Sequence, residues 1–435
     1  MKFGIFIDLQ LPRPWREGDE ARLFREALEQ VELADRLGID NVWVQEHHFL
    51  EEYCHSSAPE IFLAACSQRT KNIRLGYGIV VMSPKINHPV RTAERIATLD
   101  ILSGGRVEWG TGESGSRMEL EGFSVDFVDK RPMWAEALGE TAKMMFMNPY
   151  PGFQGKYFSM PHRNIVPKPL QKPHPPVWAA CSNRDSVKLS ASLGLGALTF
   201  AFVNAEEAKF WVDEYYETFK KECNPITQIV NPNVAMLTGF LCHNDHETAI
   251  LRGEEGAQFF AYGLSHYWRD GIHFPGKTDL WGNFKAKPAS ANHKMELERK
   301  KAGMGGIGNP ENLIRNFSAL EAAGVDQLIL LQQCGNYRHE HICESLEHFA
   351  AHVLPQFKER EALKEKAKQT ELAPFIEKAL LGIRTPKPMK DIPPVQAYPL
   401  MWKDAASEDS QTTPDRRPGM SAFWKMQIGG KHPQK

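Results

Sequence analysis

The chain has 435 residues, which is enough for one large barrel or two ordinary domains. Hydrophobic residues make up 42% and charged residues 24%, as in a globular protein with a large core, and the net charge of −2 gives no basic excess for binding nucleic acid. The seven cysteines are scattered without a Cys-x-x-Cys pair, there is no signal peptide, and no apolar run is long enough to span a bilayer. These features predict a cytoplasmic chain with reduced thiols.

Strand-like and helix-like segments alternate along the chain, and a glycine often ends the helix. Strands are predicted at 3–8, 41–49, 73–81, 106–111, 177–181, 196–202, 234–242 and 326–331. Helices are predicted at 19–37, 59–69, 90–102, about 131–147, from Ser182 to Gly194, and at 205–223, 245–265, 310–323 and 340–362. About eight strands with helical crossovers predict an α/β fold, a (β/α)8 TIM barrel, because an open doubly wound sheet would leave several strands unused.

Two segments do not follow this alternation. Residues 262–308 lie between the seventh and eighth strands and are long for a connection, so we expect an insertion there. Its aromatic residues favour a folded lid or a substrate wall; they include Tyr262, Tyr267, Trp268, Phe274, Trp281 and Phe284. We expect a barrel domain over 1–362 and an extension over 363–435, which starts as a charged helix and becomes proline-rich from Thr385. The extension's aromatic anchors are Tyr398, Trp402, Phe423 and Trp424.

The segment 41–49 begins as a strand and ends in the adjacent histidines His47 and His48. Successive strand side chains point to opposite faces, so His47 is expected on the face of Trp43, opposite the aliphatic face that packs on helices. Barrel enzymes place their chemistry at the carboxyl ends of the strands. The pair is therefore a candidate catalytic site, and a hydrogen-bonded pair of structural histidines is the alternative.

Two motifs follow later strands. Gly110-Thr-Gly112-Glu-Ser-Gly115 matches G-x-G-x-x-G, but the helix and acidic residue of a dinucleotide site are not in place, so a loop at the barrel mouth that lets backbone approach a ligand is the better interpretation. Ser182-Asn183-Arg184-Asp185-Ser186 begins a helix, where free N–H groups suit a phosphate. An ordinary helix cap is the alternative for the second motif.

A third motif concerns metal binding. The sequence His339-Glu-His341-Ile-Cys343 matches no standard zinc spacing and opens a predicted helix, so its side chains are expected on the surface. The sequence therefore predicts no metal site.

Several motifs, in this order, resemble the bacterial luciferase-like flavin monooxygenases. They are Met1-Lys-Phe-Gly-Ile-Phe, Glu46-His47-His48-Phe49, Asn87-His88-Pro89-Val90-Arg91, Leu99-Asp100-x-Leu-Ser103-x-Gly105-Arg106 and the loop after Gly110. The resemblance runs from residue 1 to about 240 and resumes at 308 through about 360, so the tail lies outside it.

The resemblance implies a barrel that binds reduced FMN at its mouth. It places His47, with His48 beside it, near the flavin, where His47 helps to form or hold a C4a-hydroperoxide. It also implies a non-proline cis peptide at Gly78-Ile79, under the isoalloxazine ring. The implied cofactor-binding residues are Gly78, Ile79, Gly112, Glu113, Ala180, Ser182, Asn183 and Ser186. The chain departs from the luciferases at Gly112, where they have a reactive cysteine, and at Glu113, where they have a basic residue that Arg117 could replace.

The implied activity is that of a two-component monooxygenase that oxygenates a small apolar or aromatic organic substrate. A separate NAD(P)H:flavin reductase would supply the reduced FMN, O2 would be the co-substrate, and the barrels would pair as a homodimer. The lack of a convincing nicotinamide motif fits this reading. Two alternatives stay open: a deazaflavin-dependent hydride-transfer enzyme on the same barrel, and a non-catalytic flavin-binding protein.

Overall fold

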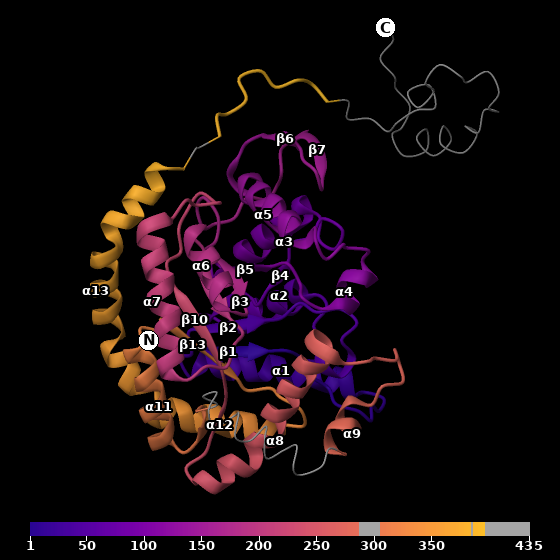
Figure 1. The fold of residues 1–435 in the computed structure, drawn as a ribbon, viewed down its shortest axis with the longest axis vertical. Helices are drawn as coiled ribbons and strands as arrows, with labels where there is room; N and C mark the ends of the chain where they lie inside the picture. Colours follow the sequence, from indigo (N-terminus) through magenta and orange to yellow (C-terminus); the bar gives the residue numbers. More distant parts are fainter. Residues whose placement is uncertain (287–304, 384–385, 396–435) are drawn as a thin grey trace, which may run out of the picture. The chain divides into compact units, whose positions relative to one another are not determined.

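A computed structural model describes residues 1–286, 305–383 and 386–395, and its centre is a closed parallel barrel (Figure 1). The barrel strands are β1 (Lys2–Ile7), β2 (Asn41–Val44), β3 (Arg74–Tyr77) continued by β4 (Val80–Val81), β5 (Val107–Gly112), β8 (Val177–Cys181), β9 (Gly196–Thr199), β10 (Val234–Gly239) and β13 (Gln327–Leu331). The order β3-β2-β1-β13-β10-β9-β8-β5 closes because β3 also pairs with β5. The predicted eight-stranded TIM barrel is confirmed.

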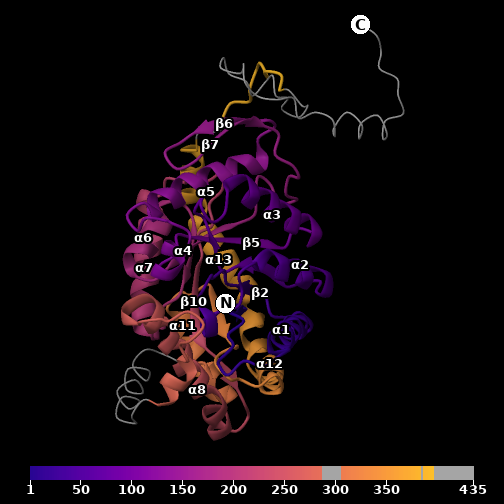
Figure 2. The same cartoon turned by 90° about the vertical axis from the view of Figure 1, so that its right-hand side faces the viewer.

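Helices surround the strands, close to the predicted positions (Figure 2). They are α1 (Asp19–Arg36), α2 (Pro59–Arg69), α3 (Pro89–Leu102), α5 (Lys130–Phe146), α6 (Arg184–Ser192), α7 (Ala205–Glu222), α8 (His246–Ser265), α11 (Pro310–Ala322), α12 (His339–His352) and α13 (Leu354–Leu381). Shorter elements are η1 (Glu51–Tyr53), α4 (Arg117–Gly122), the π-helix η2 (His266–Asp270) and α9 (Leu280–Lys285), with the short parallel pair β11 (Leu241–Cys242) and β12 (Ile307–Gly308).

Alternation along the strands divides the core into two layers. In β2, Val42 and Val44 belong to the large cluster between strands and helices, whereas Trp43 belongs to the cluster inside the barrel. Trp43 meets Trp178 edge to face, with ring centroids 5.4 Å apart. Gly76 makes room for this packing, since a Cβ there would lie 2.4 Å from the Trp43 ring.

Two elements differ from the sequence prediction. An antiparallel hairpin of β6 (Tyr150–Gln154) and β7 (Ser159–Arg163) lies where no strand was predicted, because its proline and glycine residues hide the strand signal. The helix predicted over 340–362 is two helices, which meet at Val353. Pro355 in the first turn of α13 explains the break, since proline has no N–H to continue the preceding helix.

The chain divides into two compact units, Met1–Pro388 and Met389–Lys435. The predicted anchors Tyr398, Trp402, Phe423 and Trp424 lie outside the described residues. In the part of the chain that the structure describes, no helix combines the length and apolar character needed to cross a membrane.

Candidate active site

Both predicted histidines are tied to one buried carboxylate at the carboxyl end of β2. Glu119, from α4, places Oε1 3.0 Å from Nδ1 of His47 and accepts the backbone N–H of His48 at 2.9 Å. Its other oxygen accepts the Ser114 hydroxyl at 2.7 Å. Because Glu119 is 1% exposed, its position fixes both histidines and the loop after β5 relative to one another.

The carboxylate also sets the proton distribution on His47. Burial alone would raise the pKa of Glu119, but the charge and hydrogen bond of His47, with the bonds from Ser114 and His48, lower that pKa below its ordinary value. An ionised Glu119 accepts a proton held on Nδ1 of His47, which leaves Nε2 of the ring available to a ligand. The ring also packs near Tyr53 and Trp268, with centroids 5.8 and 5.2 Å away.

His48 is held by a second carboxylate. Its Nε2 lies 3.1 Å from Oε1 of Glu46, and Glu46 also accepts the Asn87 side-chain amide at 2.7 Å and the Val81 N–H at 2.9 Å. Burial lowers the pKa of His48, but the hydrogen bond to Glu46 and the charges of Glu46 and Glu119 outweigh it, so the pKa is raised. The Glu-His-His and Asn-His-Pro motifs therefore meet in space through Glu46 and Asn87.

The alternation predicted for His47 does not run as a continuous strand, since β2 ends at Val44. Beyond β2 the backbone leaves the strand direction, and the N–H of His47 donates to the Ser56 carbonyl oxygen at 3.0 Å. His47 nevertheless faces Tyr53, which belongs to the inner aromatic cluster, while His48 packs on Phe123 with centroids 5.0 Å apart. The two histidines thus look in different directions, although the strand alternation on which that prediction rested ends at Val44.

Four residues, which we call the shelf, lie at the carboxyl ends of β3, β5 and β8: Gly78, Ile79, Gly112 and Ala180. The structure has the expected non-proline cis peptide at Gly78-Ile79. A Cβ on Gly112 would lie 2.7 Å from Ile79 and 3.4 Å from Ala180, and one on Gly110 would lie 1.9 Å from the Tyr77 carbonyl oxygen. The structure therefore brings Gly112, Ile79 and Ala180 together, and it requires glycine at both positions of the loop motif.

The motif after β8 forms a helix cap whose side chains hydrogen-bond to the backbone of the same motif. Oδ1 of Asn183 accepts the Ser186 N–H at 3.0 Å, and Oγ of Ser186 accepts the N–H groups of Ser182 and Asn183 at 3.1 and 3.2 Å. Ser182 and Asn183 are exposed, and none of the three has a hydrogen bond to the histidine pair among the contacts of the described residues. The cap leaves the N–H groups of Arg184 and Asp185, in the first turn of α6, for an anion.

Positive charge near Glu113 comes from α5, a helix that was predicted from the sequence but not connected with this loop. Arg131 of α5 donates twice to Oε1 of Glu113, at 2.7 and 3.1 Å, and Lys130 donates to the Ser114 carbonyl at 2.9 Å. Arg117, the residue expected to compensate, instead pairs with Glu121 at 2.6 Å, and its side chain is 86% exposed. α4 turns Arg117 along its own surface, toward Glu121.

The predicted insertion supplies an aromatic wall. Tyr267 and Phe284 belong to the buried cluster inside the barrel, and Tyr262, Trp268 and Trp281 pack against it, whereas Phe274 is 63% exposed. Glu52, in η1, holds this segment by accepting the Trp281 N–H at 3.0 Å. A Cβ on Gly115 would lie 2.8 Å from Trp268, so the insertion meets the glycine-rich loop. Residues 287–304 of the insertion lie outside the described residues.

Three buried polar side chains near this wall were missed by the sequence analysis. Asp8 follows β1, and both of its carboxylate oxygens are buried without a hydrogen-bond partner among the described residues; the Gln45 side-chain oxygen and the Tyr53 hydroxyl are buried near it. Burial raises the pKa of Asp8 well above its usual value, because the charged carboxylate is disfavoured away from water. The only available sequence signal was a single acidic residue at the end of a buried strand. The Asp8 carboxyl therefore has unsatisfied hydrogen-bonding capacity.

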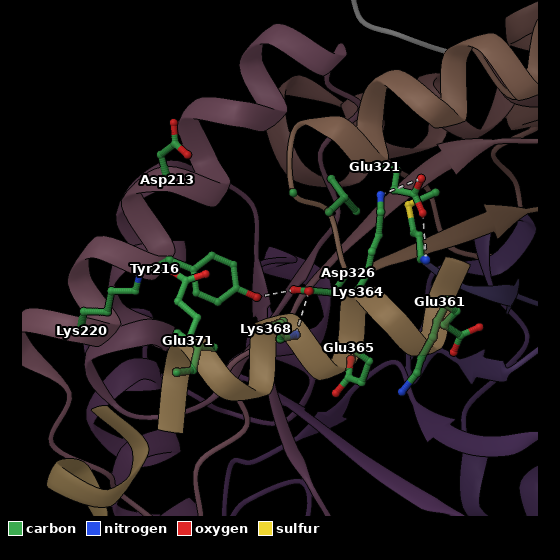
Figure 3. Close-up of a pocket in the computed structure, with 15 residues that line it drawn as sticks. Asp213, Tyr216, Lys220, Glu321, Asp326, Glu361, Lys364, Glu365, Lys368 and Glu371 are labelled. Carbon is green, nitrogen blue, oxygen red and sulfur yellow. Dashed lines mark hydrogen bonds and ion pairs between the residues drawn. The ribbon is translucent and has the colours of Figure 1, made fainter. Parts of the chain in front are cut away.

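A charged pocket of about 320 Å³ lies elsewhere, at the amino ends of the strands (Figure 3). Its charges are already paired: Glu321 contacts Lys364 at 2.9 Å, and Asp326 contacts Lys368 at 2.7 Å and the Tyr216 hydroxyl at 2.5 Å. None of the predicted site residues lines it. We therefore assign this pocket to the packing of α13 and not to catalysis.

Comparisons with known proteins place the chain in a family. The model of the family described as "Luciferase-like monooxygenase" matches residues 1–327. The chain belongs to this family. The luciferase-like chain is 33% identical over 195 residues to the uncharacterized protein y4wF of Sinorhizobium fredii, an alignment that spans 45% of the chain and 54% of that relative.

Two further proteins align with the chain over most of their length. The chain is 25% identical over 369 residues to the flavin-dependent trigonelline monooxygenase, oxygenase component, of Acinetobacter baylyi, covering 82% of this chain and 96% of that protein. Its fold is similar to the oxygenating constituent of 3,6-diketocamphane monooxygenase from Pseudomonas putida, solved in complex with FMN. That likeness has a TM-score of 0.63 at 18% identity and covers 82% and 98% of the two chains.

Proposed function

We propose that this chain is the oxygenase component of a two-component monooxygenase, which takes reduced FMN from a separate NAD(P)H:flavin reductase. Bound reduced FMN would supply the chemistry by activating O2 and delivering one oxygen atom to the substrate. The observation that carries the proposal is the buried Glu119 that orients His47 against the aromatic wall, after β2, the strand that pairs with β3, which leads into the Gly78-Ile79 cis peptide.

Each group at the mouth has a role in this proposal. Ile79, with Gly110 and Gly112 behind it, offers an apolar surface for a flat ring, because the glycines let the backbone come close. His47 holds or moves a proton at Nε2 while Glu119 keeps Nδ1 protonated. Burial raises the pKa of Asp8, which favours the protonated carboxyl, and a protonated carboxyl can donate a hydrogen bond to a polar ligand atom.

Tyr53, together with Tyr267 and Trp268 of the aromatic wall, excludes water and suits an aromatic substrate. The name of the Acinetobacter relative makes trigonelline a sensible first trial substrate. A charged nitrogen heterocycle can stack on such aromatic faces and gain cation–π attraction. We propose an aromatic substrate class on this basis.

One experiment tests two points: whether electrons must come from a separate reductase, and whether the oxygen atom in the product comes from O2. The purified chain is mixed with NADH, FMN and trigonelline under 18O2, with and without an unrelated flavin reductase. We expect labelled product only with the reductase, and a loss of roughly 10²- to 10⁴-fold in product rate for His47→Ala, because a positioned acid–base group contributes that much. Glu119→Gln should give a smaller loss, since it removes the orienting charge and keeps the ring.

Three results would count against the proposal. Rapid NADH oxidation by the chain alone would remove the need for a reductase. Reduction or oxidation of a deazaflavin without oxygen uptake would favour the hydride-transfer alternative. If reduced FMN reoxidises at the same rate with and without the protein, and no FMN binding is detected, the catalytic assignment fails whatever the substrate is.

A further inference from the structure

A second histidine and carboxylate cluster lies outside the barrel, on elements that do not carry the proposed active site. His243 follows β11, and Glu344 and His348 lie one turn apart on α12. One ligand atom from each residue can be chosen so that all three lie within 4.8 Å of one another. Figure 1 shows α8 and α12 at the same end of the first unit, where this cluster forms.

The distances suit a transition-metal ion. Nε2 of His243 lies 3.5 Å, and Nε2 of His348 lies 3.7 Å, from the same Glu344 oxygen, Oε1. Ligand atoms around a tetrahedral Zn²⁺ with bonds of roughly 2.0–2.1 Å lie about 3.3 Å apart. Both distances exceed this value by a few tenths of an ångström, which side-chain rotation can close.

The fold holds the cluster in place. The Ser345 hydroxyl accepts the Cys242 N–H at 2.7 Å, which fixes α12 against β11. Arg252 of α8 occupies the other oxygen of Glu344, Oε2, at 2.5 Å, so Oε1 faces the two imidazoles. Outer contacts of this kind orient metal ligands in proteins.

The second nitrogen of His243 has the partner that a metal-binding histidine needs. Its Nδ1 lies 3.1 Å from the Asp245 carbonyl oxygen, and the Asp245 N–H also approaches it at 3.0 Å. Metal binding would select the tautomer whose Nδ1–H donates to that carbonyl, which leaves the Nε2 lone pair for the ion.

Arg252 uses only one oxygen of Glu344: Oε2 pairs with the guanidinium at 2.5 Å, and Oε1 is left to the two imidazoles. The two Nε2 atoms and this oxygen make a set of two nitrogens and one oxygen. This set is found where zinc keeps an open coordination position.

We propose that His243, Glu344 and His348 bind Zn²⁺, which fastens the β11–α8 junction to α12. The side chains are 18%, 41% and 22% exposed, so water can reach the fourth position. The site uses neither His339, His341 nor Cys343, the residues whose spacing the sequence analysis examined. It escaped that analysis because His243 is separated from Glu344 by about a hundred residues of sequence.

The test uses Co²⁺ and Zn²⁺ on the untagged full chain. We expect the wild-type chain to bind one Co²⁺ with visible d–d absorption, and Zn²⁺ to displace it. The dissociation constant for Zn²⁺ should rise at least about 100-fold in His243→Ala and in His348→Ala, because even changes to residues that only orient the ligands cost 10- to 100-fold in affinity. Zn²⁺ should raise the melting temperature of the wild-type chain and not of the variants. His339→Ala is the matched control, because His339 lies on the same helix but contacts Gln30 and Glu29.

Two outcomes would overturn the assignment. One is the absence of d–d absorption and of Zn²⁺ binding to the folded wild-type chain. The other is equal binding to the wild-type chain and the two alanine variants, which would place the ion on other groups such as His47 and His48. Glu344→Gln keeps the side-chain volume, so it tests the site if a histidine variant does not fold.

Discussion

At the scale of single residues, Glu119 organises the mouth of the barrel. It receives three hydrogen bonds, from the His47 ring, the His48 backbone and the Ser114 hydroxyl. Hydrogen bonds to a charged acceptor are stronger than neutral ones, and an unpaired buried carboxylate would be costly. A residue outside the recognisable histidine motif therefore determines where the histidines point.

The raised pKa of His48 predicts a pH-dependent contribution to stability. A group whose folded pKa lies above its unfolded value stabilises the fold fully below the unfolded pKa of about 6.5, and this contribution is lost as the pH rises through the folded pKa. We expect His48→Gln to destabilise the chain more at about pH 6 than at about pH 8. Urea unfolding of both proteins across this range measures the difference.

His55 provides a control of opposite sign. Burial, only partly offset by Glu20, lowers the pKa of His55, so its contribution should grow as the pH rises. A His48→Gln penalty that is constant with pH, or that follows the His55→Gln profile, would refute the assigned interaction with Glu46.

At the scale of elements, the start of α6 decides whether a phosphate can bind there. Ser186 closes a capping box with Asn183, and its hydroxyl accepts two backbone N–H groups. An aspartate at this position can still accept those bonds, so Ser186→Asp keeps the helix cap while it adds a negative charge.

We expect Ser186→Asp to weaken FMN binding by at least about fivefold and to leave riboflavin binding nearly unchanged, because two unit charges about 4 Å apart repel by roughly 1–4 kcal/mol at or near a protein surface. Fluorescence titration with both flavins measures this. Ser186→Asn is the neutral control. Equal losses for FMN and riboflavin would place the phosphate elsewhere.

At the scale of the whole first unit, α13 packs beside the start of β1 and the residues just before β13, where it lines the charged pocket (Figure 3). Asp326, just before β13, accepts the Val234 N–H of β10 at 2.7 Å and contacts Tyr216 of α7 and Lys368 of α13. Phe357 and Leu372 of α13 are buried in the main core. One carboxylate thus connects a central strand with two outer helices.

Asp326→Ala should lower the free energy of unfolding by about 2–4 kcal/mol, because it leaves a partly buried lysine, a hydroxyl and an N–H without their partner. Asp213→Ala is the control from the same pocket. Asp213 pairs with Lys209 on an exposed helix face, so its loss should change stability by about 0.5 kcal/mol or less. Urea unfolding with similar losses for both variants would contradict the proposed connecting role.

The barrel itself was determined by local sequence patterns. Buried strands, amphipathic helices and glycines at helix ends repeat along the chain, and each is a short-range signal. The helix over 59–69 was predicted to the residue, because Pro59 marks its start. The hairpin β6–β7 was missed, since its proline and glycine residues conceal it and only pairing across the turn reveals it.

Only the tertiary structure decided which groups surround the histidines. The sequence indicated His47 and the shelf at Gly78-Ile79, but Glu119 is 72 positions from His47 and Asn87 is 41 from Glu46. The unpartnered Asp8 carboxyl and the convergence of His243 with Glu344 carry no local signal either. Burial and contacts between side chains far apart in sequence depend on how the barrel closes, and local periodicity does not contain that information.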